Sequence, residues 1–127
     1  MDAAYVVAVA FRFTPNEAAV DPERFEATLE IPAAEPGTDG WIFFRDRLWH
    51  GEIGDEPSFR RLAEERLGLA DAPGIEVVAA DFRELRTDDA YLDALRDAIG
   101  ADLRRFNAES VDEVLRKYLG SSVHVRE

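Results

Sequence analysis

The chain has 127 residues, 46% hydrophobic and 33% charged, with a formal net charge of −12 and no cysteine. This composition indicates one folded domain rather than a disordered chain, and it excludes disulfides, thiolate metal sites and cysteine nucleophiles. Because the sequence has neither a run of ~20 apolar residues nor a basic region before its first apolar run, it predicts a cytoplasmic protein without membrane contact.

The N-terminal part of the chain predicts two strands in succession. Residues 5–13 alternate large apolar side chains on one face, and the other face is also apolar until Arg12, so we expect a strand covered on both sides. Residues 25–31 alternate cleanly, with Phe25 and Ile31 on the inward face and glutamates on the outward face. That pattern predicts a half-exposed, antiparallel strand.

Residues 41–49 predict a third strand with an unusual division of side chains. Ile42, Phe44 and Leu48 fall on one face. The other face collects aromatic rings and guanidinium groups, from Trp41, Phe43, Arg45, Arg47 and Trp49.

Three interpretations of this aromatic and arginine face are open. The rings can be core, with the arginines extended to surface carboxylates, and the face can instead bind a protein or a small molecule. It can also bind single-stranded RNA or DNA, with bases stacked on the rings and phosphates held by arginine. Because a chain of this acidity offers its arginines many carboxylate partners, we expect a structural role for Trp49, in the core.

Helices follow in the second half of the chain. Asp55 and Pro57 predict the start of a helix that Gly68 ends. Residues 75–85 then predict a fourth strand, and an uninterrupted apolar run within it favours a central position. Thr87 is the expected cap of a second helix. Its apolar stripe includes Gly100, where we expect a kink or break, and consists of Leu92, Leu95, Ile99, Leu103 and Phe106.

The chain ends with a third helix and a short strand. Ser110 and Glu113 form a capping box for a helix over residues 111–119, which Gly120 closes, and residues 122–125 predict the strand. The predicted order is β-β-β-α-β-α-α-β over residues 1–127. It indicates a single α+β domain, with a mostly antiparallel sheet of four to five strands and about three helices packed on one face.

A histidine and two carboxylates stand close together at His50, Glu52 and Asp55. These residue types suit a metal ion or an acid–base pair. However, their spacing matches no established ligand pattern, and a turn that leads into the helix at Pro57 accounts for them. We therefore expect no metal ion, no cofactor and no catalytic residue.

The charged residues point to adaptation to salt. Twenty-seven acidic residues face 15 basic ones, of which only Lys117 is a lysine. Such a charge strains a folded chain by self-repulsion, which molar salt screens because the Debye length falls to ~3 Å. An acidic protein of an ordinary cytoplasm is the alternative. In a salt-adapted protein this charge says little about partners, so nucleic acid stays open as a ligand.

Two segments, FFRDRLWHGE (residues 43–52) and ESVDEVLRKYLGSSVHVR (residues 109–126), resemble the haloarchaeal LWR-salt protein family, over essentially the whole chain. The family takes its name from a Leu-Trp-Arg motif, which Leu48 and Trp49 match, while His50 stands where arginine is expected. A histidine there cannot supply the permanent bidentate charge of arginine. The resemblance implies a halophilic archaeal source and no catalytic residues.

Together these observations favour a non-enzymatic module that binds a protein or a small molecule. The alternative is a single-stranded nucleic-acid binder that uses the aromatic and arginine face. An enzyme centred on His50, Glu52 and Asp55 is a third hypothesis, which requires a cavity that converges on the histidine.

Overall fold

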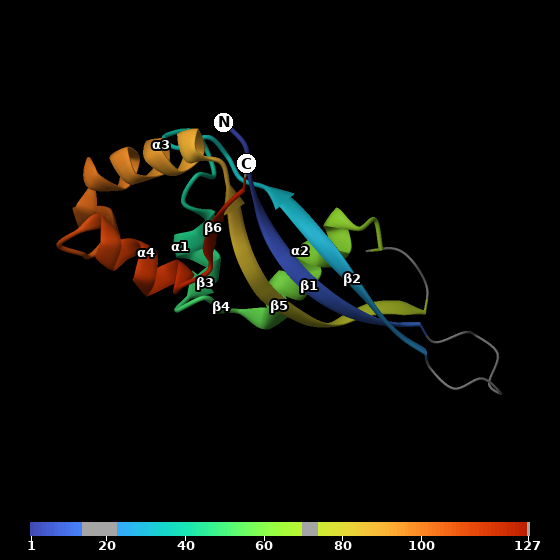
Figure 1. Ribbon diagram of the computed structural model, residues 1–127. Helices are drawn as coiled ribbons and strands as arrows, with labels where there is room; N and C mark the ends of the chain where they lie inside the picture. The colour runs from blue at the N-terminus through green and yellow to red at the C-terminus, as the bar shows by residue number, and fades with distance from the viewer. Residues whose placement is uncertain (14–22, 70–73, 127) are drawn as a thin grey trace.

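The computed structural model of the protein describes residues 1–13, 23–69 and 74–126 (Figure 1). In chain order the elements are β1 (Ala3–Phe13), β2 (Glu23–Pro32), α1 (Phe43–Arg47), β3 (Leu48–Trp49), β4 (Glu52–Ile53), α2 (Glu56–Arg66), β5 (Ile75–Thr87), α3 (Asp89–Gly100), the 3-10 helix η1 (Leu103–Phe106), α4 (Val111–Leu119) and β6 (Val123–Val125). This arrangement confirms the predicted α+β class. Within these ranges, no helix combines the length and the apolar character that crossing a membrane requires.

The main sheet has the strand order β2-β1-β5-β6, with only β6 parallel to its neighbour. The predicted central position of the fourth strand, β5, is therefore confirmed. The register between β1 and β5 shifts between Val6 and Val7 and again between Ala10 and Phe11. Bulges of this kind bend a strand and increase its twist, and Figure 1 shows β1 and β5 as long, curved ribbons.

The core lies on one face of this sheet. Tyr5, Val7 and Val9 of β1 are at most 2% exposed, whereas Val6 and Ala8 on the opposite face are only partly buried. Figure 1 shows α2 behind the sheet and, among the described residues, no helix in front of it. The expectation that this strand is covered on both sides is therefore wrong. The helices close one face and leave the other to charged side chains.

The segment at residues 41–49 differs most from its prediction, because it forms helix α1 and only two residues of strand. The buried residues Trp41, Phe44 and Leu48 stand three and four positions apart, which is the helical period. In so short a segment the rings and arginines fit both the strand period of two and the helical period of ~3.6. Packing in the folded protein favours the helix. The predicted sheet face of alternating rings and arginines is therefore absent.

The helix boundaries mostly follow the predicted caps. The Asp55 carboxylate accepts from the Ser58 N–H at the start of α2, and Ser110 caps α4 over the predicted residues. Helix α3 ends at Gly100, where a break was expected. The predicted cap of α3 was wrong by one residue. Thr87 ends β5, and the Asp88 carboxylate accepts from the Tyr91 N–H.

Helix α2 also protects an edge of β5 that β6 leaves without a partner strand. Glu56 and Glu64, two turns apart on α2, accept hydrogen bonds from the β5 N–H groups of Ala80 (3.3 Å) and Val77 (3.1 Å). Because exposed strand edges invite pairing with other chains, these carboxylates stand in for a neighbouring strand.

Leucines on α4 give a direct test of the core. Leu119 is fully buried and Leu115 only partly, so Leu119→Ala should lower the free energy of unfolding by ~2–5 kcal/mol and Leu115→Ala by clearly less. Denaturant unfolding of both variants measures the difference. Equal losses would contradict the packing of α4 described here.

Candidate functional site

The candidate site lies where a two-residue hairpin turn meets the end of a helix distant in the sequence. His50 and Gly51 connect β3 to β4, and both have positive φ values, 51° and 78°. This is the backbone of a type I′ hairpin turn, which suits glycine and which histidine tolerates better than most residues. The His50 N–H donates to the Lys117 carbonyl (2.8 Å), and the Gly51 N–H donates to the Tyr118 carbonyl (3.0 Å).

These two hydrogen bonds join the hairpin to the last turn of α4. The final carbonyls of a helix lack partners within the helix, so the turn supplies donors that α4 cannot provide. The approach is close on both sides. A Cβ atom on Gly51 would lie 3.2 Å from the Leu119 carbonyl oxygen, and one on Gly120 would lie 3.3 Å from the His50 carbonyl group.

Trp49 sits beside this junction with its side chain outward. The residue is 49% exposed, while Leu48, its neighbour in β3, is 3% exposed. The expectation of a core Trp49 is therefore wrong. Successive strand residues point to opposite sides, and Leu48 takes the inward position. Tyr118 and His50 meet the Trp49 ring edge-on, with centroids 5.8 and 4.7 Å away.

The only lysine of the chain fixes this arrangement from the α4 side. The Lys117 ammonium donates to the carbonyls of Phe106 (3.1 Å) and Asn107 (3.3 Å), at the end of η1. It also lies 5.8 Å from the centre of the Trp49 ring and 5.6 Å from that of Tyr118. Both distances allow a cation–π attraction, so Lys117 ties η1, α4 and β3 together.

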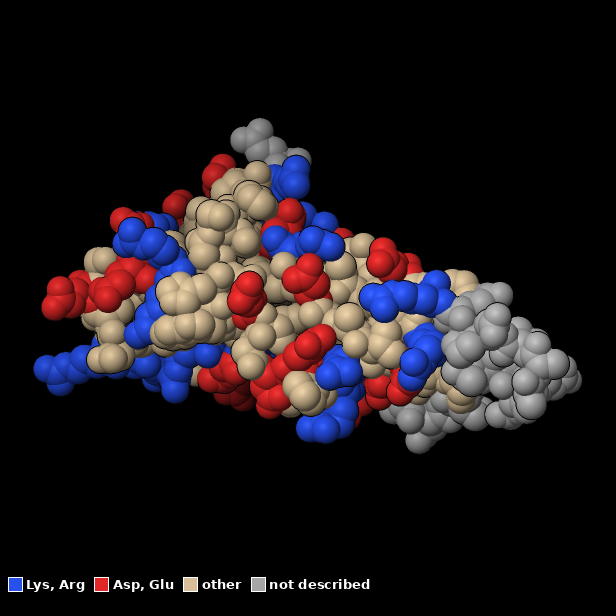
Figure 2. Space-filling view, turned by 90° about the horizontal axis from the view of Figure 1, so that it is seen from below, with Lys and Arg blue, Asp and Glu red and all other residues tan. Residues whose placement is uncertain are grey.

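These residues surround a shallow cavity of about 270 Å³. We call it the Trp49 surface; it is lined by Trp49, His50, Glu113, Arg116 and Lys117. Figure 2 shows acidic and basic side chains interspersed with uncharged ones over one face of the molecule. An exposed indole, a guanidinium and an ammonium group therefore share one concave surface.

The other residues of the predicted aromatic and arginine face are dispersed. Trp41 is 8% exposed and packs edge-on against Phe44 and Phe106. Phe43 is half-buried against Tyr5, with ring centroids 4.7 Å apart. Arg45 is exposed on α1, and Arg47 donates to the Ser58 hydroxyl (3.1 Å). Of the five predicted residues, only Trp49 lines the Trp49 surface.

His50, Glu52 and Asp55 have structural roles and do not form one cluster. Asp55 caps α2, Glu52 pairs with Trp49 in the β3–β4 ladder, and His50 forms the turn. No group of three acidic or histidine side chains that could hold a metal ion occurs within residues 1–13, 23–69 and 74–126.

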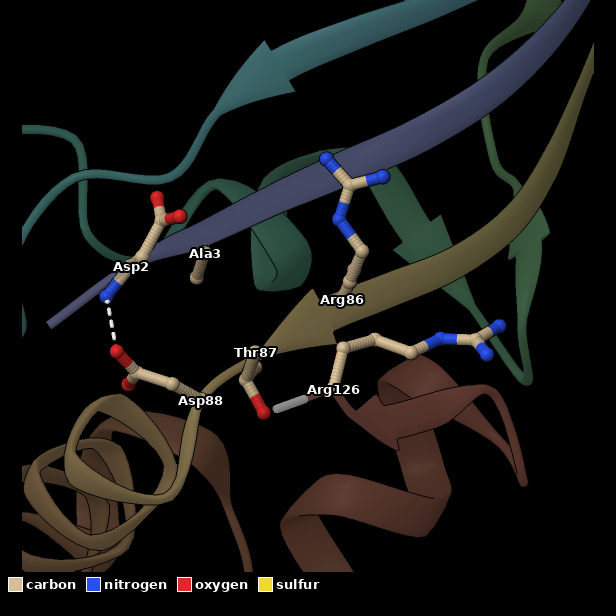
Figure 3. Close-up of a pocket in the computed structure, with 6 residues that line it drawn as sticks. All are labelled: Asp2, Ala3, Arg86, Thr87, Asp88 and Arg126. Atoms are coloured by element: carbon tan, nitrogen blue, oxygen red, sulfur yellow. Dashed lines mark hydrogen bonds between the residues drawn. The ribbon is translucent and has the colours of Figure 1, made fainter.

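A second, smaller cavity of about 60 Å³ lies where β5 passes into α3 (Figure 3). The charged groups of Arg86, Asp88 and Arg126 already have partners. The Asp88 carboxylate accepts from the Tyr91 and Asp2 N–H groups, which hold its pKa below the ordinary value. Arg86 pairs with Glu30 at 2.7 Å, and Figure 3 shows the side chains of Arg86 and Arg126 extending away from Asp88. The Trp49 surface is therefore the better candidate.

Arg126, which follows β6, belongs to a charged cluster with Glu84 of β5 and His124 of β6. Its guanidinium lies 3.4 Å from the Glu84 carboxylate, which is also 3.1 Å from His124 Nδ1. Partial burial disfavours ionisation of Glu84, but the contacts with His124 and Arg126 outweigh it and hold the Glu84 pKa below its ordinary value. This cluster holds the short β6 strand to its neighbour.

Sequence reasoning identified Trp49 but not its neighbours Arg116 and Lys117. These two cations lie in the last turn of α4, where they complement the helix dipole, and nothing in their local pattern links them to a hairpin 67 positions earlier. One signal was available: the two segments that carried the family resemblance are those that meet at the junction.

The whole chain, residues 1–127, matches the model of a family described as LWR-salt protein. No curated protein and no solved structure matches the chain.

The close approach at the junction predicts a specific effect of Gly51→Ala. Gly37 is the matched control, because its φ is also positive (89°) and no atom lies within 4 Å of an added Cβ. Gly51→Ala should therefore cost ~1–3 kcal/mol more unfolding free energy than Gly37→Ala, and it should speed amide exchange at His50. Equal costs and an unchanged His50 exchange rate would contradict the junction.

Proposed function

Because the chain belongs to the LWR-salt protein family and carries an exposed tryptophan on a concave surface, we propose that it is a non-enzymatic interaction module. In this proposal it works in a cytoplasm of high salt and binds a partner protein through the Trp49 surface. The exposure of Trp49 is the observation that carries the proposal.

Residues of the types found here are those that dominate binding energy in protein interfaces. Tryptophan, tyrosine and arginine are enriched among such residues. Trp49 and Arg116 line the same cavity, and Tyr118 and Lys117 hold the indole in place. A ring that is already ordered loses little further side-chain entropy on binding, which favours affinity.

A protein partner fits this surface better than a nucleic acid. Single strands bind where successive bases stack on several exposed rings along a cationic groove. Here one indole is exposed, and Trp41, the other tryptophan, is buried. The helix at Phe43–Arg47 also removes the sheet face on which the nucleic-acid alternative rested.

The ionic groups near the Trp49 surface support a binding role rather than catalysis. Lys117 is engaged with two backbone carbonyls, and Glu113 accepts from the Glu109 N–H (2.7 Å). Asp55 is committed to the start of α2. Groups that maintain the backbone in this way are poorly placed to exchange protons with a substrate.

Two features of the charge support adaptation to salt. The chain has a net charge of −12 and only one lysine, and arginine provides its other basic side chains. The lysine is engaged at the junction. Carboxylates of α3 such as Asp93 and Asp97 are exposed and form no ion pair within the described residues. Their mutual repulsion is screened only when the Debye length is short.

This charge predicts that stability rises with salt. The thermal midpoint should increase as potassium chloride is raised from ~0.1 M to ~1 M, because the Debye length falls from ~10 to ~3 Å. The double variant Asp93→Asn/Asp97→Asn should show a smaller increase. A thermal midpoint that does not change across this range would contradict salt adaptation.

The binding role predicts partner capture that depends on Trp49. In ~1 M potassium chloride, immobilised protein should enrich a defined set of proteins from cells that produce it, and Trp49→Ala should lose that set. Phe25→Ala is the matched control, since Phe25 is an aromatic residue of similar exposure (43%) on β2. Loss of the same proteins with Phe25→Ala, or their retention with Trp49→Ala, would refute the proposal.

A further inference from the structure

We infer that the Trp49 surface recognises an acidic segment of its partner, in which an apolar side chain covers Trp49 and a neighbouring carboxylate binds Arg116. This inference rests on the proposed function and adds the chemistry of the partner. It commits to a peptide segment of a protein, with nucleic acid as an alternative outcome of the test.

The local charge of the surface is opposite to that of the chain. Arg116 and Lys117 are cationic, whereas Glu113 is the one anionic residue that lines the cavity. The Glu113 carboxylate already accepts from the Glu109 N–H at 2.7 Å. In a chain of net charge −12, this surface therefore attracts carboxylates instead of repelling them.

Arg116 is the cation available to a ligand. Its side chain is exposed in the last turn of α4, and it forms no ion pair within residues 1–13, 23–69 and 74–126. Lys117, by contrast, spends two of its three donors on backbone carbonyls. A guanidinium that is not engaged can bind a carboxylate through two parallel hydrogen bonds.

The apolar half of the site is the exposed part of the Trp49 ring. Tyr118 and His50 contact this ring edge-on, so its orientation is fixed while 49% of the residue stays accessible. The cavity is shallow, and its volume of about 270 Å³ lies at the lower limit of the ~300–1,000 Å³ of typical small-molecule sites. It suits one or two side chains of a longer segment, as at protein interfaces.

Molar salt permits this combination of contacts. Long-range repulsion between an acidic segment and an acidic protein disappears when the Debye length is ~3 Å, whereas a carboxylate in direct contact with Arg116 is screened less once the bound segment partly buries the pair. Burial of apolar surface on Trp49 is not weakened by such screening. Affinity should therefore fall less steeply with potassium chloride than the affinity of a nucleic-acid complex, which depends on many ionic contacts.

To test this, capped synthetic peptides are titrated into the full chain in ~1 M potassium chloride. Binding is measured by tryptophan fluorescence and by amide NMR shifts. The first peptide has one leucine between two glutamates. In the second, glutamines replace the glutamates, and in the third, serine replaces the leucine. We expect saturable binding of the first peptide with shifts at Trp49 and Arg116, and binding at least about tenfold weaker for the other two.

Variants separate the two halves of the site. Arg116→Gln should weaken binding of the acidic peptide about tenfold and leave the glutamine peptide unaffected. Arg104→Gln, at an exposed arginine that does not line the cavity, should bind as the wild type does. Trp49→Ala should abolish binding, and circular dichroism shows whether this variant is folded. The Arg116→Gln result tests the inference even if the Trp49→Ala variant does not fold.

Other outcomes overturn the inference. Equal binding of the glutamate and glutamine peptides would contradict the acidic partner. Binding of oligouridylate at Trp49, together with no binding of any peptide, would contradict a peptide partner. If no peptide binds while partner capture still depends on Trp49, the proposed function stands and the acidic partner is wrong. If both experiments fail, both proposals fall.

Discussion

Two backbone hydrogen bonds decide how the candidate site is built. Donation from His50 and Gly51 to the carbonyls of Lys117 and Tyr118 places a hairpin turn against the end of α4. Glycine at Gly51 and Gly120 permits this distance, since a Cβ on either would press on the opposing backbone. Because the turn is fixed, Trp49 and Arg116, which are 67 positions apart in the chain, come to line the same cavity. The exposed indole is thus a consequence of how the backbone ends α4.

The sequence predicted elements well wherever one period alone fitted the apolar residues. Strand β2 and helix α4 are of this kind, and α4 has the predicted bounds because Ser110 and Gly120 mark both of its ends. Residues 41–49 failed because their rings and arginines fit either period. The decision came from Phe106 and Tyr118, whose rings enclose Phe44 at centroid distances of 5.7 and 6.0 Å. Contacts between residues so far apart in sequence are invisible to a local pattern.

The candidate site was predictable only in part, for the same reason. Trp49 stood out by composition, but its side was assigned on the assumption of one continuous strand. Leu48 and Trp49 of the two-residue strand β3 do point to opposite sides. However, residues 43–47 form a helix, so Arg45 and Arg47 do not lie beside Trp49 as a continuous strand would place them. The true neighbours come from α4, and only the fold brings them there. Residue type therefore pointed to Trp49, whereas the choice of its neighbours belonged to topology.

Lys117 shows why a chain that relies on arginine keeps one lysine. The ammonium is a compact charge with three donors, and here it lies between two carbonyl oxygens and two aromatic rings. The planar fork of arginine matches carboxylates, which is its use at Glu30, Asp112 and Glu84 elsewhere on this protein. It cannot place one point charge among four partners in this way. The lysine therefore organises the Trp49 surface, and Arg116, one residue earlier, is left to meet a ligand.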